Sequence, residues 1–310
     1  MSDALHARHA SRPSRGLRIA LPIGLAVTAL GALWALTDAP VAADATAPAP
    51  PIPAVAAQLP GVVVGSVAPA DPCADPAVTD ALAAGDDEAA IAAFGGGSAF
   101  RDAVVAGNAA CVSLTDPTRR WVVVNKATPL APADYEPAGM TEGPIQMTTA
   151  SRLIREDASA ALADMAAALN AAGAGELGMN NAYRSYRLQV SNYSGQVASA
   201  GQETADLSSA RPGHSEHQTG LAVDVVACSA GCGEIGAFGG TPESDWIAAH
   251  AWEHGFIVRY EAGATGTTGY EPEPWHLRYV GPALAAAYHE GGYHTLEEFF
   301  GLPAAPDYAH

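Results

Sequence analysis

The chain has 310 residues and a formal net charge of −18. Such an acidic balance argues against nucleic acid as a partner, because binding to phosphates requires a basic surface. The chain contains a single lysine, Lys126, so arginines are the candidates for holding a substrate carboxylate. A surface ion pair is the favoured alternative for all of them except Arg184. These candidates are Arg184, Arg187, Arg211, Arg259 and Arg278.

The N-terminal part of the chain predicts export. Four arginines precede an uncharged apolar stretch, Ile19–Leu36, which as a helix would span about 27 Å, close to a bilayer core of roughly 30 Å. Residues 1–43 are therefore interpreted as a signal peptide or a membrane anchor, and both stay open because Val41 and Ala43 offer a cleavage site. Residues 44–70 are rich in alanine and proline and predict an extended linker. The remainder would act outside the cytoplasm, anchored by an N-terminal segment in the membrane or secreted after cleavage.

Residues 71–118 predict a small helical region ahead of the catalytic part. Alanine-rich stretches at Val78–Ala84 and Glu88–Phe94 are typical of helices, and the three glycines Gly95–Gly97 interrupt them. We find no chemical motif in this region, so its role is left open.

The four cysteines of an exported chain predict two disulfides. Three pairings are possible, and sequence order favours Cys73 with Cys111 and Cys228 with Cys232. Free thiols are the alternative. A zinc site on Cys228 and Cys232 is a weaker alternative, since two thiolates without a matching second pair do not make a closed site.

Residues 119–310 predict an α+β catalytic domain. Helices and strands alternate without the regular units of a parallel sheet, which favours a central antiparallel sheet flanked by helices. In chain order we expect a β-rich segment at Trp121–Asn125, a helix over about Thr148–Ala172, a strand turning into a helix over Asn180–Gln189, a strand at Leu221–Val226, a helix at Ser244–His254, and strands at Gly255–Tyr260 and Trp275–Gly281.

Two short segments of this domain predict a catalytic zinc site. His217 and Asp224 offer one imidazole and one carboxylate from a single segment, and His276 adds a second imidazole from a distant one. Three such ligands leave the fourth tetrahedral position free for water or substrate, as in catalytic rather than structural zinc sites. Glu273, three residues before His276, could reach that water without binding the metal. It is the expected general base.

Three other histidines compete as ligands. His214 lies three residues before His217, but the Pro-Gly pair ahead of it predicts a loop, so we interpret it as a rim residue. His250 and His254 would share one face of a helix. That helix lacks the glutamate directly after the first histidine that a metalloprotease helix carries, and a helix packed in the core is the favoured interpretation.

These motifs resemble the VanY type of zinc D-Ala-D-Ala carboxypeptidases, in the peptidase group that also includes the VanX dipeptidases. The family pattern SxHxxGxxxD is matched by Ser215, His217, Gly220 and Asp224, ExxH by Glu273 and His276, and an upstream YRS by Tyr183, Arg184 and Ser185. The resemblance covers about Trp121–Leu302. It implies an α+β fold with the zinc site in a cleft.

The resemblance also implies a role for each matched residue. His217, Asp224 and His276 would bind Zn²⁺, and Glu273 would activate the water. Arg184 would stabilise the oxyanion, since a fixed guanidinium can meet the negative charge that develops on the attacked carbonyl oxygen.

Three further residues are expected to contact substrate. Ser215 lacks the strand, elbow and helix around the nucleophile of a serine hydrolase, so we assign it to substrate contact or to support of the ligands. Tyr183 belongs to the YRS motif. Gln189 would lie near the rim of the cleft, on the helix that follows Arg184.

The expected reaction is hydrolysis of the last peptide bond of peptidoglycan stem peptides, which releases the terminal D-Ala. The substrate class comes from the resemblance, and export agrees with it because cell-wall peptide lies outside the membrane. An L,D-carboxypeptidase that acts on tetrapeptide stems is the nearest alternative. A noncatalytic zinc-containing wall-binding protein is another, although the intact Glu273 and Arg184 argue against it. A dipeptidase for free D-Ala-D-Ala is disfavoured by export, and the sequence leaves the oligomeric state open.

Overall fold

The computed structural model describes residues 71–149 and 152–308. The predicted signal or anchor (1–43) and the whole predicted linker (44–70) lie outside these residues, so both stay predictions. In the part of the chain that is described, no helix is long and apolar enough to cross a membrane.

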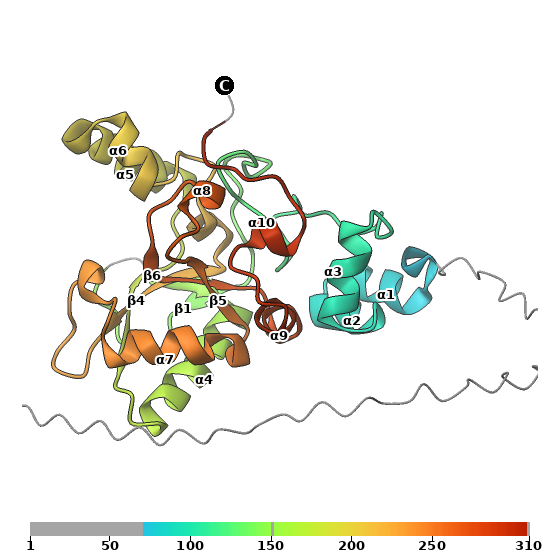
Figure 1. Ribbon diagram of the computed structural model, residues 1–310, viewed down its shortest axis with the longest axis horizontal. Coiled ribbons are helices and arrows are strands. Elements are labelled where there is room, and N and C mark those ends of the chain that lie inside the picture. The colour runs from blue at the N-terminus through green and yellow to red at the C-terminus, as the bar shows by residue number, and fades with distance from the viewer. Residues whose placement is uncertain (1–70, 150–151, 309–310) are drawn as a thin grey trace, which may run out of the picture. The chain divides into compact units, whose positions relative to one another are not determined.

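The described residues form helices and short antiparallel strands (Figure 1). The helices are α1 (Pro76–Ala84), α2 (Asp87–Ala93), α3 (Gly97–Val105), α4 (Glu156–Ala171), α5 (Tyr186–Ala200), α6 (Gln202–Ser208), α7 (Pro242–His250), α8 (Thr265–Thr268), α9 (Pro282–Glu290) and α10 (Leu296–Phe299). The strands are β1 (Met140–Glu142), β2 (Leu153–Arg155), β3 (Leu177–Asn181), β4 (Ala222–Ala227), β5 (Phe256–Tyr260) and β6 (Glu273–Tyr279). The predicted α+β class is confirmed.

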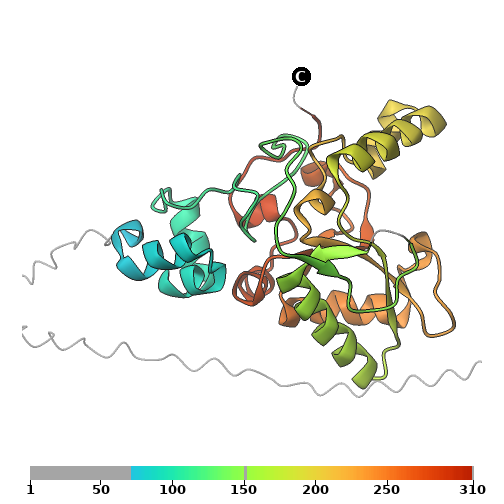
Figure 2. The same ribbon diagram turned by 180° about the vertical axis from the view of Figure 1, so that it is seen from behind.

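The central sheet has four antiparallel strands in the order β3-β4-β6-β5. Helices α4 and α7 lie beneath it in Figures 1 and 2, whereas α5 and α6 project on the opposite side. Strand residues alternate between these two sides. Val223, Val225 and Leu277 belong to the apolar core that α4 and α7 complete. Their neighbours Asp224 and His276 therefore point to the side of α5.

Two register irregularities bring further polar side chains to that side. The pairing shifts between Met179 and Asn181 in β3, and between Val258 and Tyr260 in β5. Met179 and Val258 pack in or against the core, whereas Asn181 and Tyr260 line the cleft described below. A bulge redirects the side chains that follow it, which explains the change of face.

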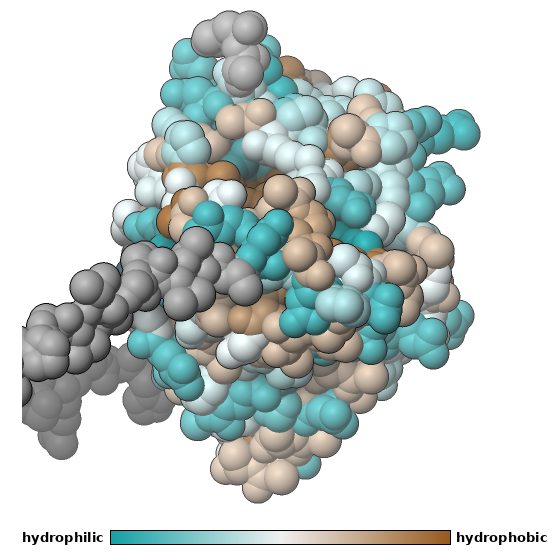
Figure 3. Space-filling view, turned by 90° about the vertical axis from the view of Figure 1, so that its right-hand side faces the viewer, coloured by the Kyte–Doolittle hydropathy of each residue, from teal (hydrophilic) through white to brown (hydrophobic). Residues whose placement is uncertain are grey.

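The region 71–118 contains the helices α1–α3, as expected, and shares an apolar core with the helices at the C-terminal end. Asp75 and Asp86 cap α1 and α2 by accepting backbone N–H bonds. Phe100 and Trp121 pack in one cluster with Leu284 of α9. Figure 3 shows the face that carries α1–α3, where strongly hydrophobic residues form only small patches among hydrophilic ones. The apolar side chains of these helices are largely used in the shared core.

Both expected disulfides are present. Cys73 pairs with Cys111 across the helical region, and Cys228 pairs with Cys232 in the loop after β4. All four cysteines are therefore used, and the alternative zinc site on Cys228 and Cys232 is excluded.

The β-rich character expected for Trp121–Asn125 is wrong. Its valines are buried, but the segment pairs with no strand among the described residues. Val123 N–H donates to Leu114 O at 2.8 Å, and the guanidinium of Arg278 donates to the carbonyls of Arg120 and Val122 at 2.9 and 2.8 Å. A buried arginine thus satisfies carbonyls that a neighbouring strand would otherwise bond.

The helix expected from about Thr148 begins later, at Glu156. The residues before it pair with β1 as strand β2 instead. Two acidic residues, Glu156 and Asp157, occupy the first turn of α4, where negative charge is favoured by the helix dipole. The expected C-terminal end is confirmed, since Gly173 follows the helix with a φ of +71°.

Candidate active site

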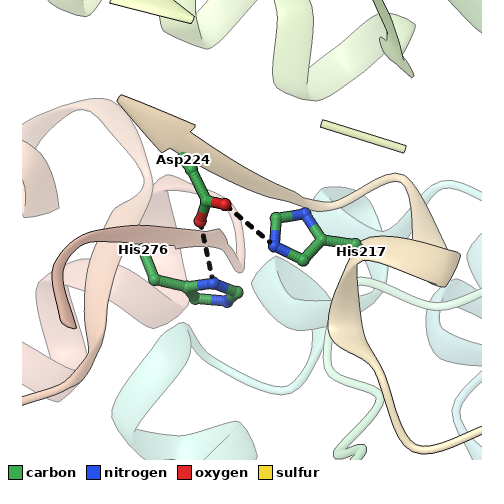
Figure 4. Close-up of side chains that lie close together, drawn as sticks. All are labelled: His217, Asp224 and His276. Carbon is green, nitrogen blue, oxygen red and sulfur yellow. Dashed lines mark hydrogen bonds and ion pairs between the residues drawn. The ribbon is translucent and has the colours of Figure 1, made fainter. Parts of the chain in front are cut away.

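Three buried side chains meet at the centre of the sheet (Figure 4). One Asp224 oxygen lies 3.1 Å from Nδ1 of His276, and the other lies 3.4 Å from Nε2 of His217. One ligand atom from each of the three residues lies within 4.8 Å of the others. The predicted ligands are therefore brought together, and they are the one group of this kind in the described residues.

Sheet register and one turn bring the three residues together. Asp224 and His276 are direct partners in the β4–β6 pairing, so a long sequence separation becomes a cross-strand contact. His217 lies in the 3₁₀ turn Glu216–Thr219 that leads into β4. Gly220 ends that turn with a φ of +72°, where a side chain would be strained and would meet Met140 Sδ at 2.9 Å. The turn explains why the motif places a glycine between His217 and Asp224.

In both His217 and His276, the ring nitrogen that points away from Asp224 faces a hydrogen-bond acceptor. Nδ1 of His217 lies 2.8 Å from the carbonyl of Ala182, and Nε2 of His276 lies 3.4 Å from Oε2 of Glu216. Each outer nitrogen can therefore carry the proton, which leaves the inner nitrogen as a lone-pair donor. Two imidazoles and a carboxylate so arranged suit Zn²⁺.

The environment favours the metal-binding protonation states of His217 and Asp224. Burial lowers the pKa of His217. For Asp224, burial opposes ionisation, but the two histidines outweigh it and hold the pKa of the carboxyl well below its ordinary value. A neutral imidazole and an ionised carboxylate are the forms that ligate a metal. At His276, burial opposes the charged form, but the bonds to Asp224 and Glu216 outweigh burial and raise the pKa to about 9, so a metal must displace a proton there.

Glu273 stands beside these residues at the start of β6. Its Oε2 lies 3.7 Å from Nδ1 of His276, and its side chain lines the cleft. Burial raises the pKa of Glu273 to about 7. A carboxylate with that pKa can take and return a proton near neutral pH.

Arg184 lies at the junction of β3 and α5, on the wall of the same cleft. Its guanidinium donates to Oε1 of Gln189 at 2.9 Å, and its backbone N–H donates to the carbonyl of His217 at 3.1 Å. Burial lowers the pKa of Arg184. The guanidinium is thus held by a neutral amide and directed at the site.

The cleft around these residues has a volume of about 700 Å³. Uncharged residues on the exposed face of α5 line one part of it, and aromatic residues line another. The α5 wall consists of Ser191, Asn192, Gly195, Gln196 and Ser199, and the aromatic residues are Tyr260, Tyr270 and Trp275.

A family model for VanY D-alanyl-D-alanine carboxypeptidases matches residues 151–282, which include all the residues of the site described above. The putative carboxypeptidase YodJ of Bacillus subtilis (strain 168) is 37% identical over 192 residues, which are 61% of this chain and 69% of that protein. The chain belongs to the VanY-type D-alanyl-D-alanine carboxypeptidase family. It is accordingly a peptidase.

Two further proteins similar to this VanY-type chain carry the names of different carboxypeptidases. A D-alanyl-D-alanine carboxypeptidase of Enterococcus faecium is 40% identical over 87 residues, which are 28% of this chain and 26% of that protein. The solved structure of the LdcB LD-carboxypeptidase is 38% identical, with a TM-score of 0.56, and the match covers 60% of this chain and 87% of that one.

Not every predicted substrate contact of this VanY-type site lies in the cleft. Ser215 is buried and lines it. Tyr183 is half-buried and is not among the lining residues. Gln189 does not lie at the rim as expected, because its side chain is fully buried and donates to the carbonyl of Ala210 at 2.6 Å. Its contact with Arg184 makes it a support for that guanidinium.

Two of the arginines considered as candidates for binding a substrate carboxylate lie in the protein interior and do not line the cleft. Arg259 and Arg278 are fully buried and pair with Glu216, so they form neither surface ion pairs nor part of the cleft wall. Sequence reasoning missed Glu216 itself. Its place between Ser215 and His217 was the available signal, since it adjoins an expected metal ligand.

The competing histidines are engaged elsewhere. His214 Nδ1 lies 2.8 Å from the carbonyl of Asn125, and its ring contacts Tyr308. His250 Nδ1 lies 2.9 Å from a Glu253 oxygen, and both His250 and His254 pack against Trp246. None of the three joins the candidate metal-binding group His217, Asp224 and His276 found in the described residues.

Proposed function

We propose that this protein is a zinc-dependent D,D-carboxypeptidase that removes the terminal D-Ala from peptidoglycan stem peptides, outside the cytoplasm. The observation that carries the proposal is the buried group His217, Asp224 and His276, placed in a cleft beside Glu273. Membership of the VanY-type family supports the substrate class.

Each residue would have a distinct task in this reaction. His217, Asp224 and His276 would hold Zn²⁺, which supplies a Lewis acid for the scissile carbonyl and lowers the pKa of a water molecule to about 7. Glu273 would accept a proton from the attacking water and deliver it to the departing amine of D-Ala as the C–N bond breaks. The Arg184 guanidinium would meet the negative charge on the attacked carbonyl oxygen.

The cleft supports a substrate longer than a free dipeptide. Its volume of about 700 Å³ extends from the catalytic residues along the exposed face of α5. Serine, asparagine and glutamine side chains there can bond to peptide groups without requiring a charged ligand. A stem peptide attached to the cell wall would use this wall for the part that precedes the cleaved bond.

One observation favours a second candidate, an L,D-carboxypeptidase that removes D-Ala from tetrapeptide stems. The solved LdcB LD-carboxypeptidase shares 38% identity with this chain at a TM-score of 0.56. The two activities need the same metal site and base, and they differ in the stereochemistry of the residue before the cleaved bond.

Digests of synthetic penta- and tetrapeptide stems, followed by mass spectrometry, test the proposal. The full chain with zinc should release D-Ala from the pentapeptide and stop at the tetrapeptide. Release from the tetrapeptide alone would replace the D,D assignment with the L,D one. No release from either peptide, by protein that contains zinc, would support the noncatalytic wall-binding alternative.

Replacing Arg184 with lysine is expected to lower kcat/KM for D-Ala release by about 10²–10³-fold. Lysine keeps the charge but loses the planar fork that Gln189 orients. Zinc content should not change, because Arg184 is not among the grouped metal ligands. Steady-state kinetics and metal analysis check both points.

The matched control for this substitution is Arg187→Lys, three residues further along the chain at an exposed position of α5. Equal kinetics in the two variants would contradict the role of Arg184.

A further inference from the structure

Four fully buried charged residues form a network beneath the metal-binding group. Glu216 pairs with Arg259 at 3.0 Å and with Arg278 at 2.7 Å. The guanidinium of Arg259 also makes two bonds to the carboxylate of Glu297, at 3.0 and 2.8 Å. Two carboxylates thus balance two guanidiniums, and the network joins the turn before β4 to β5, β6 and α10.

The two oxygens of Glu216 have different partners. Both arginines donate to Oε1. Oε2 faces Nε2 of His276 at 3.4 Å, on the side of the imidazole opposite Asp224. Arg259 lies in β5, and Arg278 and His276 both lie in β6. Because these strands fix the two arginines and the imidazole, the carboxylate is held in the orientation that presents Oε2 to His276.

Stability alone is a poor explanation for this network. Taking charged groups out of water costs several kcal/mol per ion, and well-packed apolar residues of similar volume are often as stable or more stable. Glu216 is the member of the network that contacts a residue of the metal-binding group. A carboxylate behind a metal-bound histidine commonly fixes the ring and its tautomer.

We propose that Glu216 is a positioning residue for the metal site, which keeps the proton of His276 on Nε2 and so directs the Nδ1 lone pair at the metal. The inference rests on the proposed zinc function. Arg259 and Arg278 act through Glu216, because they hold its other oxygen.

Glu216→Gln makes the inference testable because it should reverse the bond to His276. The two guanidiniums can only donate, so they select the amide oxygen of the new side chain. The amide NH₂ is then turned toward Nε2 of His276, which must accept. The imidazole proton moves to Nδ1, where it competes directly with the metal.

Zinc affinity, measured by competition with a chromophoric chelator, is the primary readout. Glu216→Gln should weaken zinc binding by about 10- to 100-fold. Glu297→Gln is the matched control, since it neutralises the other buried carboxylate of Arg259 without touching His276. The zinc affinity of Glu297→Gln should stay close to that of the unmodified chain, even if its melting temperature falls as much as that of Glu216→Gln. Long-range ¹H–¹⁵N spectra of the zinc-loaded unmodified chain should place the His276 proton on Nε2.

Three results would overturn the inference: unchanged zinc affinity in Glu216→Gln, an equal loss in Glu297→Gln, or a His276 proton on Nδ1. If Glu216→Gln does not fold, Glu216→Asp replaces it, because it keeps the charge for the arginines while withdrawing the oxygen from His276. Zinc affinity should then fall as well, and an unchanged value would count against the inference. Failure of the unmodified chain to bind zinc would instead refute the proposed function.

Discussion

Replacing Glu273 with glutamine is expected to lower kcat for D-Ala release by about 10²–10⁴-fold. The amide keeps the size of the side chain but cannot accept the proton of the attacking water. Glu273 is not one of the grouped ligands, so zinc content should stay that of the unmodified chain. Release of D-Ala under single-turnover conditions, with metal analysis of the same sample, measures both quantities.

Glu271 provides the control for this substitution. It lies two residues earlier on the same segment, is exposed and does not line the cleft. Glu271→Gln should therefore leave kcat close to its original value. Loss of zinc from Glu273→Gln would show that Glu273 is a ligand, and full activity in that variant would remove it from the reaction.

Replacing His217 with alanine is expected to remove zinc and activity together. The site would keep two protein ligands, and a buried Asp224 would lose one of the two histidines that stabilise its charge. Both the polarised carbonyl and the activated water depend on the metal, so activity should fall on the order of 10⁴-fold or more. Zinc content after dialysis, read beside D-Ala release, measures the outcome.

A neighbouring histidine separates ligand loss from a general effect of histidine removal. His214 is three residues away and bonds to the carbonyl of Asn125, outside the metal-binding group. His214→Ala should keep its zinc. If His217→Ala also kept zinc after dialysis, the ligand set proposed here would be wrong.

The grouping of His217, Asp224 and His276 could be predicted because these residues carry local signals. His217, Gly220 and Asp224 lie within one turn and one strand, where spacing translates directly into position. The contribution of His276 required the strand pairing that places it opposite Asp224. Alternating apolar residues predicted the strand at Leu221–Val226, a second strand was expected at Trp275–Gly281, and family resemblance supplied the partnership between His276 and Asp224.

Residues whose role depends on buried polar contacts were harder to predict. An arginine in a strand has the same sequence pattern whether it faces water or a buried carboxylate, so Arg259 and Arg278 gave no sign of their pairing with Glu216. The valines after Trp121 have strand-like composition, but the carbonyls there bond to Arg278. Gln189 lies in the first turn of α5, five residues after Arg184, and only packing decides that its side chain points inward.

The measurement that tests the central claim most directly is zinc-dependent release of D-Ala from a synthetic stem pentapeptide. The full chain should lose activity on treatment with a chelator and regain it when zinc is restored, with activity proportional to bound zinc. Release that persists in fully demetallated protein would contradict a reaction built on His217, Asp224 and His276.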